Sequence, residues 1–378
     1  MGQDKAGDIM SLKCRDIINL LEKLAHPKHA EAWDNVGLQI GSPEASISKI
    51  LVTLDLNLEV VLEAINSQVD MIIVHHTPFF KPVDKILWNT PQGTIIQKLI
   101  HHNINLYCAH TNLDSCWGGI NDVLADLLGL QEVQVLEPNW QEKYFKLVVF
   151  VPEGYEDKIR KALGAAGAGW IGMYSDCSFQ VLGTGTFKPL EGADPFIGKK
   201  GQLEKVQEYR LETIVPNGLI KQVIDNMLLA HPYEEVAYDL YPLANSGATS
   251  GLGRIGILEE EKTLLNIIVN LKEQLKIKDL RYVGDLKQGI KRIALCGGSG
   301  ASLIKKAALE EAQLYITGDI KYHEAQEAES LGLALIDAGH YATEHPIVDS
   351  LVNYLSKNSL GKVEIIASQV NTDPFKFI

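Results

Sequence analysis

The sequence predicts an α/β protein in which a parallel sheet covered by helices is interrupted by a smaller α+β segment. Short apolar runs suited to buried strands alternate with helical periodicity before residue 130, and this alternation returns after residue 253. Between these two parts, residues 144–243 follow a different order of elements. Apolar residues make up 46% of the chain, which is enough to bury a full core in each part.

The first part begins with an amphipathic helix, whose apolar residues recur at helical spacing until Pro27 ends it. Strands and helices then alternate, and a β-α-β rhythm of this kind produces parallel strands with helices packed on the sheet. The expected helices are Cys14–Ala25, Leu58–Ser67, Thr94–Ile100 and Asn121–Leu128, and the expected strands are Ile47–Leu54, Met71–Val74 and Ile104–Ala109.

The middle segment has the order β-α-β-β-α-β, which is the ferredoxin-like arrangement. Its expected strands are Tyr144–Val151, Ser178–Thr186, Lys205–Val215 and Val236–Leu243, and its expected helices are Glu156–Ala166 and Leu219–Ala230. Residues 191–201 are rich in Gly and Pro and predict a mobile hairpin loop between the middle strands. The composition of Asn245–Gly253 is that of a linker.

The last part returns to the first architecture. Its expected strands are Arg292–Cys296, Leu314–Thr317, Ala334–Ile336 and Val363–Ile366, and its expected helices are Leu264–Leu275, Ala301–Ala312 and Ile347–Leu355. The turn Gly297-Gly-Ser-Gly300 precedes a helix, so its backbone N–H groups suit an anion such as phosphate. A tight strand-to-helix turn explains these glycines equally well, and no Walker motif follows them.

Charge and cysteine content narrow the class of protein. The net charge of −13 and the pI near 5.3 argue against a nucleic-acid surface, which is normally basic. The five cysteines are scattered, and their odd number fits reduced, mostly buried thiols. No apolar run approaches the ~18 residues of a membrane span, and the first dozen residues lack a signal-peptide core. We therefore expect a cytoplasmic protein.

Candidate metal ligands follow three of the expected strands. His75 and His76 end the second strand, His110 and Asp114 follow the third, and His340 and Glu344 follow Ala334–Ile336 with helical spacing. Chemistry in α/β proteins gathers beyond the carboxyl ends of strands. Alone, the His pair also fits a surface position and Asp114 also fits a helix cap, so the convergence of all three strand ends carries the prediction.

Two other features have simpler interpretations. His101 and His102 end an expected helix, where they suit capping and interaction with the helix dipole better than ligation. Trp33, in a turn with Asp34 and Asn35, suits either packing or the lip of a substrate site.

Imidazole and carboxylate together suit Zn, Fe or Mn better than Ca or Mg. If one carboxylate bridges, the predicted groups suit two ions about 3.5 Å apart, a pair that generates a hydroxide nucleophile near neutral pH. His110 and His323 are the candidate acid/base groups.

Several motifs resemble those of the Nif-three-like family, also catalogued as GTP cyclohydrolase I type 2 homologs. They are WDNVGL (33–38), HHTPFF (75–80), AHTNLD (109–114), Gly-Gly-Ser-Gly (297–300), TGDIKYHEAQ (317–326) and DAGHYATE (337–344). Residues 185–198 and 231–243 resemble the CutA- or PII-like domain that longer bacterial members carry.

This resemblance implies a three-layer α/β domain formed by residues 1–137 and 245–378, with a CutA/PII-like domain at 138–244. It also implies two divalent ions per subunit, with Zn as the expected metal and Fe or Mn as alternatives. In the family pattern, Glu344 bridges both ions, His75 and Asp114 complete one, and His76 and His340 complete the other. His110 then has a role beside the ligands or in catalysis. Toroidal homohexamers, with the inserted domains over the openings, are a further implication.

The first functional hypothesis is a metal-dependent hydrolase of a nucleotide-like or phosphorylated small molecule, with GTP ring opening as one instance. The alternative is a metal-binding regulatory or chaperone-like assembly whose inserted domain senses a ligand. A DNA-handling ring is a third hypothesis, and the acidic charge speaks against it. The expected partners are further copies of the chain and a small molecule, with neither membrane nor nucleic acid.

Overall fold

The structure is a computed structural model that describes residues 12–77 and 79–376. The chain forms two compact units, which are described separately. One contains the residues up to Trp140 and those from Ser250 onwards, and the other contains Gln141–Thr249. The expected mixed α/β fold is confirmed, whereas the domain ranges 1–137, 138–244 and 245–378 stay a prediction.

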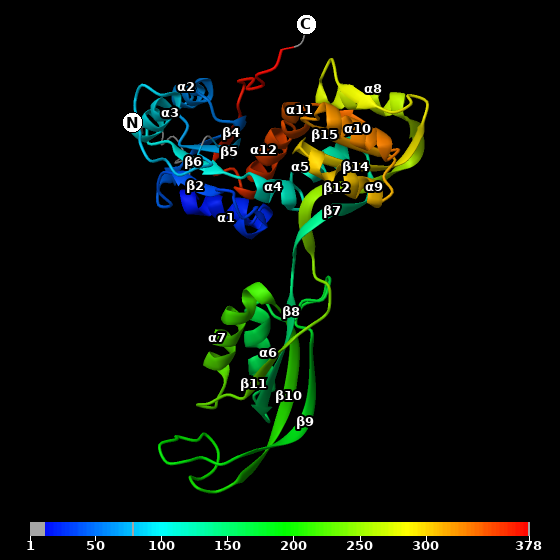
Figure 1. Cartoon of the computed structure of the whole chain (residues 1–378). Coiled ribbons are helices and arrows are strands. Elements are labelled where there is room, and N and C mark those ends of the chain that lie inside the picture. Colours follow the sequence, from blue (N-terminus) through cyan, green and yellow to red (C-terminus); the bar gives the residue numbers. More distant parts are fainter. Residues whose placement is uncertain (1–11, 78, 377–378) are drawn as a thin grey trace, which may run out of the picture. The chain divides into compact units, whose positions relative to one another are not determined.

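The first unit contains a five-stranded sheet with the order β17-β4-β5-β6-β2 (Figure 1). Its central strands pair in parallel and only β2, at one edge, runs antiparallel to its neighbour β6. The strands are β2 (Gly37–Ile40), β4 (Lys49–Asp55), β5 (Met71–His76), β6 (Asn105–Cys108) and β17 (Glu364–Ala367). Continuous apolar runs form the central strands because helices cover both of their faces.

Each face of this sheet has its own apolar core. One core joins the sheet to α1 (Cys14–Leu24) and α12 (Ile347–Asn358), through residues such as Ile17 and Leu351. The other joins it to α2 (Leu58–Asn66) and α3 (Pro91–His101), through residues such as Val60. Pro27 begins the short η1 (Pro27–His29), and β1 (Leu12–Lys13) pairs with β3 (Ser46–Ile47) beside the sheet.

A second sheet in the same unit has the order β13-β16-β15-β14-β12-β7. Parallel pairing joins β14, β15 and β16, so the carboxyl ends of these three strands lie at one edge. The strands are β7 (Gln131–Gln141), β12 (Thr249–Thr263), β13 (Arg281–Val283), β14 (Gly289–Ser299), β15 (Leu314–Gly318) and β16 (Ala334–Asp337).

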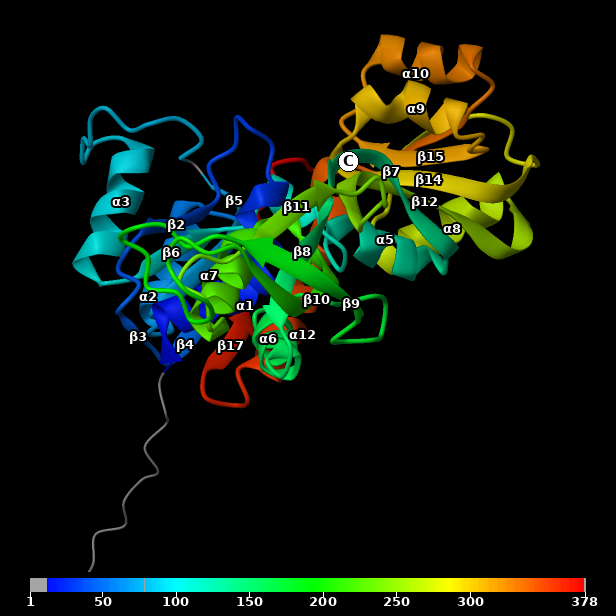
Figure 2. The same ribbon diagram turned by 90° about the horizontal axis from the view of Figure 1, so that it is seen from below.

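Helices cover both faces of the second sheet as well. Figure 2 shows α9 (Ile304–Leu309) and α10 (Tyr322–Ser330) on one face, with α5 (Ile120–Leu128) and α8 (Leu264–Leu275) on the other. The two cores are apolar on both sides of the strands. Because α5 also packs against the core shared with α1 and α12, through Ile120, it links the two sheets of the unit.

Several elements differ from the sequence-based expectations; among them, strand β7 was not predicted. The expected linker 245–253 becomes strand β12 from Thr249 on, because its Gly- and Ser-rich start lies against β7 in the sheet and its later residues pair with β14. The expected helix Ala301–Ala312 consists of η3 (Ala301–Leu303) followed by the shorter α9. Helix α10 was not predicted, because its sequence YHEAQEAES has only a weak apolar face.

The second unit has a four-stranded antiparallel sheet with the order β11-β8-β10-β9. Its elements are β8 (Tyr144–Pro152), α6 (Glu156–Ala165), β9 (Ser178–Phe187), β10 (Glu204–Pro216), η2 (Asn217–Leu219), α7 (Ile220–Ala230) and β11 (Tyr238–Pro242). Both helices lie on one face of the sheet, over a core that includes Val149 and Leu211 (Figure 1). The opposite face, with Phe150 and Glu208, carries no helix.

All five cysteines are unpaired and four of them are buried, as the sequence predicts. None of the helices in the described part of the chain is long and apolar enough to cross a membrane.

Candidate metal centre

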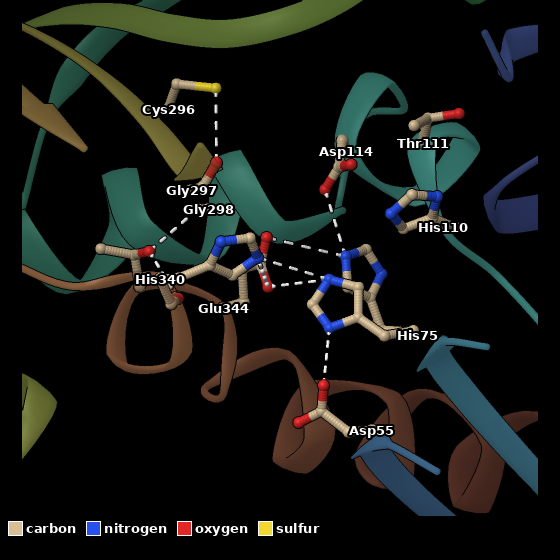
Figure 3. A network of polar contacts seen from close by, with 12 residues as sticks. Asp55, His75, His110, Thr111, Asp114, Cys296, Gly297, Gly298, His340 and Glu344 are labelled. Atoms are coloured by element: carbon tan, nitrogen blue, oxygen red, sulfur yellow. Dashed lines mark hydrogen bonds and ion pairs between the residues drawn. The ribbon is translucent and has the colours of Figure 1, made fainter. Parts of the chain in front are cut away.

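Four histidines and two carboxylates from separate strand ends converge in the first unit (Figure 3). His75 and His76 are the last two residues of β5. His110 caps the short helix α4 (Thr111–Ser115), which follows β6 and carries Asp114. The remaining two, His340 and Glu344, begin and end α11 (His340–Glu344), which follows β16. β5 and β6 are parallel neighbours in the five-stranded sheet, whereas β16 belongs to the six-stranded sheet, so the cluster forms where the segments after the carboxyl ends of strands from both sheets come together.

Glu344 lies at the middle of the cluster. Its Oε2 is 3.2 Å from Nε2 of His76 and 3.1 Å from Nε2 of His340. Its Oε1 is 3.8 Å from Nε2 of His75, which in turn is 3.7 Å from Oδ1 of Asp114. Glu344 is only 4% exposed and His75 1%, so water cannot solvate these charges freely.

The second ring nitrogen of each histidine has its own acceptor. Nδ1 of His75 lies 2.8 Å from the carbonyl oxygen of Ala109. Nδ1 of His76 lies 2.9 Å from Asp55, and Nδ1 of His110 lies 3.0 Å from Asp34.

Nδ1 of His340 completes the pattern, 2.7 Å from Asp319. With each Nδ1–H donating outward, Nε2 points into the cluster, and metal-binding histidines are oriented in this way.

The cluster is electrostatically unusual. Burial lowers the pKa of His75, but Asp114 and Glu344 outweigh it and raise the value to about 9. Hydrogen bonding to Glu344, against the effect of burial, raises the pKa of His340 to about 9. Burial raises the pKa of Asp114 to about 6, despite the neighbouring His75. For Glu344, burial acts upward, but the surrounding histidines hold the pKa well below its usual range.

These residues fit a metal ion. Nε2 of His75, Oδ1 of Asp114 and Oε2 of Glu344 are buried and have no hydrogen-bond partner. Nε2 of His76 and Nε2 of His340 also face the same carboxylate oxygen, so in the neutral form of both rings acceptors meet there, and a bound cation offsets this in place of a proton. Nitrogen and oxygen donors of this kind suit a transition metal or zinc.

Three overlapping groups of donor atoms could hold an ion. They are His75 with Asp114 and Glu344, His76 with His340 and Glu344, and His75 with His76 and His110. Each of the five residues expected to be ligands therefore belongs to at least one of these groups. His110, which was assigned a role beside the ligands or in catalysis, also reaches the cluster.

His323 does not reach the cluster. It is exposed in the first turn of α10, where its Nδ1 lies 3.0 Å from Gln326. His101 and His102 are also elsewhere, exposed at the end of α3. Neither ring has a hydrogen bond to the helix carbonyls among the described residues, so capping by these side chains stays a prediction.

Sequence reasoning did not identify the acceptors that orient the histidines. The only hint in the sequence is the position of these acceptors: Asp55 and Asp319 follow expected strands, and Asp34 lies in an expected turn. Their pairing with particular histidines joins residues up to 76 positions apart, so spacing could not reveal it.

The glycine-rich turn supports the cluster directly. A Cβ at Gly298, where φ is +65°, would collide with Oε1 of Glu344. The N–H groups of Gly297, Gly298 and Gly300 donate to side chains of the fold, including Thr343 and Thr317. The turn therefore packs the end of β14 against α11. Because these three N–H groups already donate to protein side chains, they are not free to bind an anion.

The cluster opens into a cavity of about 620 Å³. Four carboxylates line it together with the rings of Phe80, Tyr341 and Phe375; these carboxylates are Asp55, Asp279, Asp319 and Asp373. The rings of Phe80 and Trp33 lie 5.2 and 6.0 Å from His110, measured between ring centroids.

A comparison with protein families shows which family the chain belongs to. The Duf34/NIF3 family (NGG1p interacting factor 3) matches residues 12–374. The chain belongs to this family. A Bacillus subtilis relative named GTP cyclohydrolase 1 type 2 homolog is 43% identical over 371 residues, covering 97% of this chain and 99% of the relative. A Halalkalibacterium halodurans relative of the same name is 44% identical, covering 96% and 98%.

Solved structures of Duf34/NIF3 relatives share the fold over nearly the whole chain. A Bacillus cereus protein described as related to NIF3 has a TM-score of 0.88 and 44% identity, covering 97% of this chain and 99% of its own. A Staphylococcus aureus protein has a TM-score of 0.79 and 32% identity, covering 97% and 99%.

Proposed function

We propose that this Duf34/NIF3 protein is a dinuclear metal-dependent hydrolase of a nucleotide-like or phosphorylated small molecule. The observation that carries the proposal is the pair of donor groups that share Glu344, each containing a buried atom without a hydrogen-bond partner. One shared carboxylate between two sets of donors is the arrangement that two-metal hydrolases require.

In this proposal, His75 and Asp114 hold one divalent ion, His76 and His340 hold the other, and Glu344 serves both. Zinc is the proposed metal, with iron or manganese as alternatives for the same donor set. When bound, such ions lower the pKa of a coordinated water and stabilise developing negative charge.

The chain's own residues orient and complete the site. Asp55 and Asp319 fix the rings of His76 and His340, so that both Nε2 lone pairs stay directed at the cluster. Asp34 fixes His110 in the same way, and we assign His110 the transfer of a proton to or from the substrate. His323 was the other acid/base candidate; it belongs to none of the three donor groups and does not line the cavity, so we assign the role to His110.

The surroundings of the cluster favour a substrate with a flat ring. Trp33 is 64% exposed and Phe80 is 41% exposed, and both rings lie beside His110, so they offer an apolar surface to a base. The acidic cavity repels a free phosphate, so a phosphorylated substrate depends on positive charge held at the cluster. The name of the relatives makes GTP the first substrate to test.

We further propose that the 141–249 unit is a ferredoxin-like domain of the CutA/PII kind, and that the protein is a cytoplasmic toroidal homohexamer. Its β-α-β-β-α-β order and the strand order β11-β8-β10-β9 support the domain assignment. The unpaired thiols support a reducing compartment. Light scattering of the purified protein should give the mass of six chains, whereas a monomer or dimer would contradict the assembly.

The decisive experiment measures metal content and hydrolysis on the same samples. Wild type, Glu344→Gln and the control Glu329→Gln, which removes an exposed glutamate of α10, are stripped with chelator and reloaded with Zn, Mn or Fe. Each is then analysed by elemental analysis and assayed with GTP and a panel of phosphoesters. We expect about two equivalents per chain in wild type and the control, with turnover of at least one substrate.

Glu344→Gln should lose most of its metal and at least about 100-fold in turnover, because it removes the charge that both donor groups share. A His110→Gln variant should keep its metal and lose turnover. Two equivalents of metal without turnover of any substrate would reject the hydrolase assignment and leave the metal site intact. A wild-type protein that takes up no metal would reject both.

A further inference from the structure

The 141–249 unit contains a pocket of about 350 Å³ that is separate from the metal cluster in sequence and in chemistry. It lies between the end of β9, the loop around Phe196 that connects β9 to β10, and the turn that leads from α7 to β11. Figure 1 shows the long β9–β10 connection at the end of this sheet that is remote from η2.

Aromatic rings form much of the pocket wall. The ring of Tyr233 lies 6.1 Å from both Phe187 and Phe196, measured between centroids, with interplanar angles of 55° and 48°. Phe150, from the sheet face that carries no helix, also lines the pocket. Several aromatic rings around one space make a lining that favours a cation over a neutral polar group.

A buried carboxylate lies among these rings. Glu208 on β10 is only 8% exposed, and its Oε1 accepts a hydrogen bond of 3.0 Å from the hydroxyl of Tyr233. Among the described residues, Tyr233 is the only hydrogen-bond or ion-pair partner of this side chain. Burial and the Glu208 carboxylate raise the pKa of Tyr233, so its hydroxyl keeps the proton that it donates.

The neighbouring backbone makes room for this carboxylate. A Cβ at Gly185 on β9 would collide with Oε2 of Glu208, so glycine at this position lets the carboxylate lie against the strand. The second oxygen therefore lies against strand β9 and has no protein donor among the described residues. A carboxylate oxygen in this state gains from a cation or donor that approaches it from outside.

The charge of the lining points the same way. Three carboxylates line the pocket, those of Glu208, Glu234 and Glu235, against the single ammonium group of Lys188. Anionic ligands are therefore disfavoured, while a cation gains from both the carboxylates and the rings. A strongly hydrated metal ion would gain little from the aromatic wall, whereas an organic cation matches both parts of the lining.

The turn that carries Tyr233 is held in place before any ligand arrives. His231 is 8% exposed; its Nδ1 accepts from the backbone N–H of Tyr233 at 3.1 Å, and its Nε2 donates to the carbonyl of Phe150 at 3.1 Å. One neutral ring thus ties the turn to strand β8. This preorganisation reduces the entropy that a ligand must lose on binding.

We propose that this pocket binds a small organic cation, a substituted ammonium compound whose charge lies between Glu208 and the rings of Phe187, Phe196 and Tyr233. Such a ligand would place its apolar substituents against the rings and its positive charge beside the unpartnered carboxylate oxygen. The pocket contains no residue of the metal cluster, so this binding is independent of the proposed hydrolase activity.

The test uses the full-length protein and two probes of nearly equal shape. Choline carries a quaternary ammonium group, and 3,3-dimethylbutan-1-ol replaces its nitrogen with a neutral carbon. Titration calorimetry should show one saturable choline site per chain, at least about tenfold tighter than the neutral probe. Glu208→Gln and Phe196→Leu should each weaken choline binding about tenfold, and neither should change binding of the neutral probe to the same extent.

Glu212→Gln is the matched control, because this glutamate lies on the same strand β10 but outside the pocket, beside Arg210. It should bind choline as wild type does. Phe196 is 50% exposed, so Phe196→Leu keeps the test decisive if Glu208→Gln proves unstable in thermal unfolding. Equal affinities for the two probes, or choline binding that survives both pocket substitutions, would overturn the proposal.

Discussion

The chain contains two His-His pairs, one in the candidate metal cluster and one exposed at the surface. His75-His76 ends strand β5, and each ring is oriented by an acceptor, the carbonyl of Ala109 and the carboxylate of Asp55. His101-His102 ends helix α3, and both rings are exposed, with no hydrogen-bond partner among the described residues. The first pair faces a buried carboxylate, whereas the second faces water.

The difference shows that the dipeptide itself does not define a metal site. A strand end buried between helices and facing a second sheet can gather ligands from other segments, as it does here with Glu344. A helix end at the surface has only its own last turn and solvent as neighbours. The element that precedes the pair therefore decides its role.

The strongest test of this comparison replaces each pair in turn. His75→Ala/His76→Ala should abolish metal binding, because it removes ligands from all three donor groups. His101→Ala/His102→Ala, the matched change at the helix end, should leave metal content unchanged. Elemental analysis after metal reloading measures both. Equal metal contents in the two variants would break the comparison.

The strand-end cluster also depends on a buried support that the helix pair lacks. Arg254 on β12 is fully buried; it donates to both carboxylate oxygens of Asp122, and also to the carbonyl of Cys116, which follows the α4 helix of Asp114. Removing one partner of a buried pair leaves the other charge uncompensated, so Arg254→Met should lower the free energy of unfolding by about 3 kcal/mol or more.

Urea denaturation measures this loss. Arg15→Met is the matched control, since Arg15 pairs with Glu44 at the surface and both side chains are more than half exposed. Its effect should stay within about 1 kcal/mol. If Arg254→Met also lowered the free energy of unfolding by no more than about 1 kcal/mol, this ion pair would not support the cluster.

A smaller effect should come from the acceptors that orient the histidines. Asp55→Ala or Asp319→Ala removes the partner of a ring Nδ1 and leaves every proposed ligand in place. We expect each to weaken zinc affinity about 10- to 100-fold, as outer partners of metal-bound histidines commonly do. Competition with a chromophoric chelator measures the affinity, and Asp126→Ala, at an exposed position of α5, serves as the control.

If the Asp55 and Asp319 variants bound zinc as tightly as the control, the orientation of the rings would not distinguish the two His pairs. The exposed location of the second pair alone would then explain its lack of ligation.

The smallest effect concerns a single histidine in a third environment. His29 packs 4.7 Å from the ring of Trp140, and its Nδ1 is buried without a hydrogen-bond partner. Burial, with smaller contributions from Lys28 and His26, lowers its pKa to about 4. Because this value lies below that of the unfolded chain, near 6.5, the unfolded state takes up the proton first as the pH falls.

The stability that neutral His29 contributes is therefore complete above about pH 6.5 and is lost between there and about pH 4. Between pH 7.5 and pH 5, wild type should lose about 1 kcal/mol more than His29→Gln, a figure discounted because the ring is partly exposed. Urea denaturation at both pH values measures the difference. The control His101→Gln should lose as much stability between the two pH values as wild type does. If His29→Gln also lost as much as wild type, His29 would not contribute to this pH dependence.

The sequence by itself determined the fold class and the residues of the cluster. Strands such as Met71–Val74 are recognisable because both faces of a parallel strand are buried, so their apolar runs are continuous. His75, His76, Asp114, His340 and Glu344 could be proposed as one cluster because each follows the carboxyl end of a strand, where chemistry in α/β proteins gathers. The sequence did not reveal that β16 lies in a different sheet from β5 and β6. The spacing of apolar residues and the order of strands and helices are properties that the sequence carries directly.

The tertiary structure decided what local patterns cannot express. Strand β12 begins inside a Gly- and Ser-rich segment because a neighbouring strand pairs with it, and His323 lies away from the cluster because α10 directs it to solvent. His110 pairs with Asp34, and the carboxylate of Glu208 lies against Gly185; both contacts join residues distant in the chain. Such contacts depend on the packed positions of whole elements, which spacing within one segment does not determine.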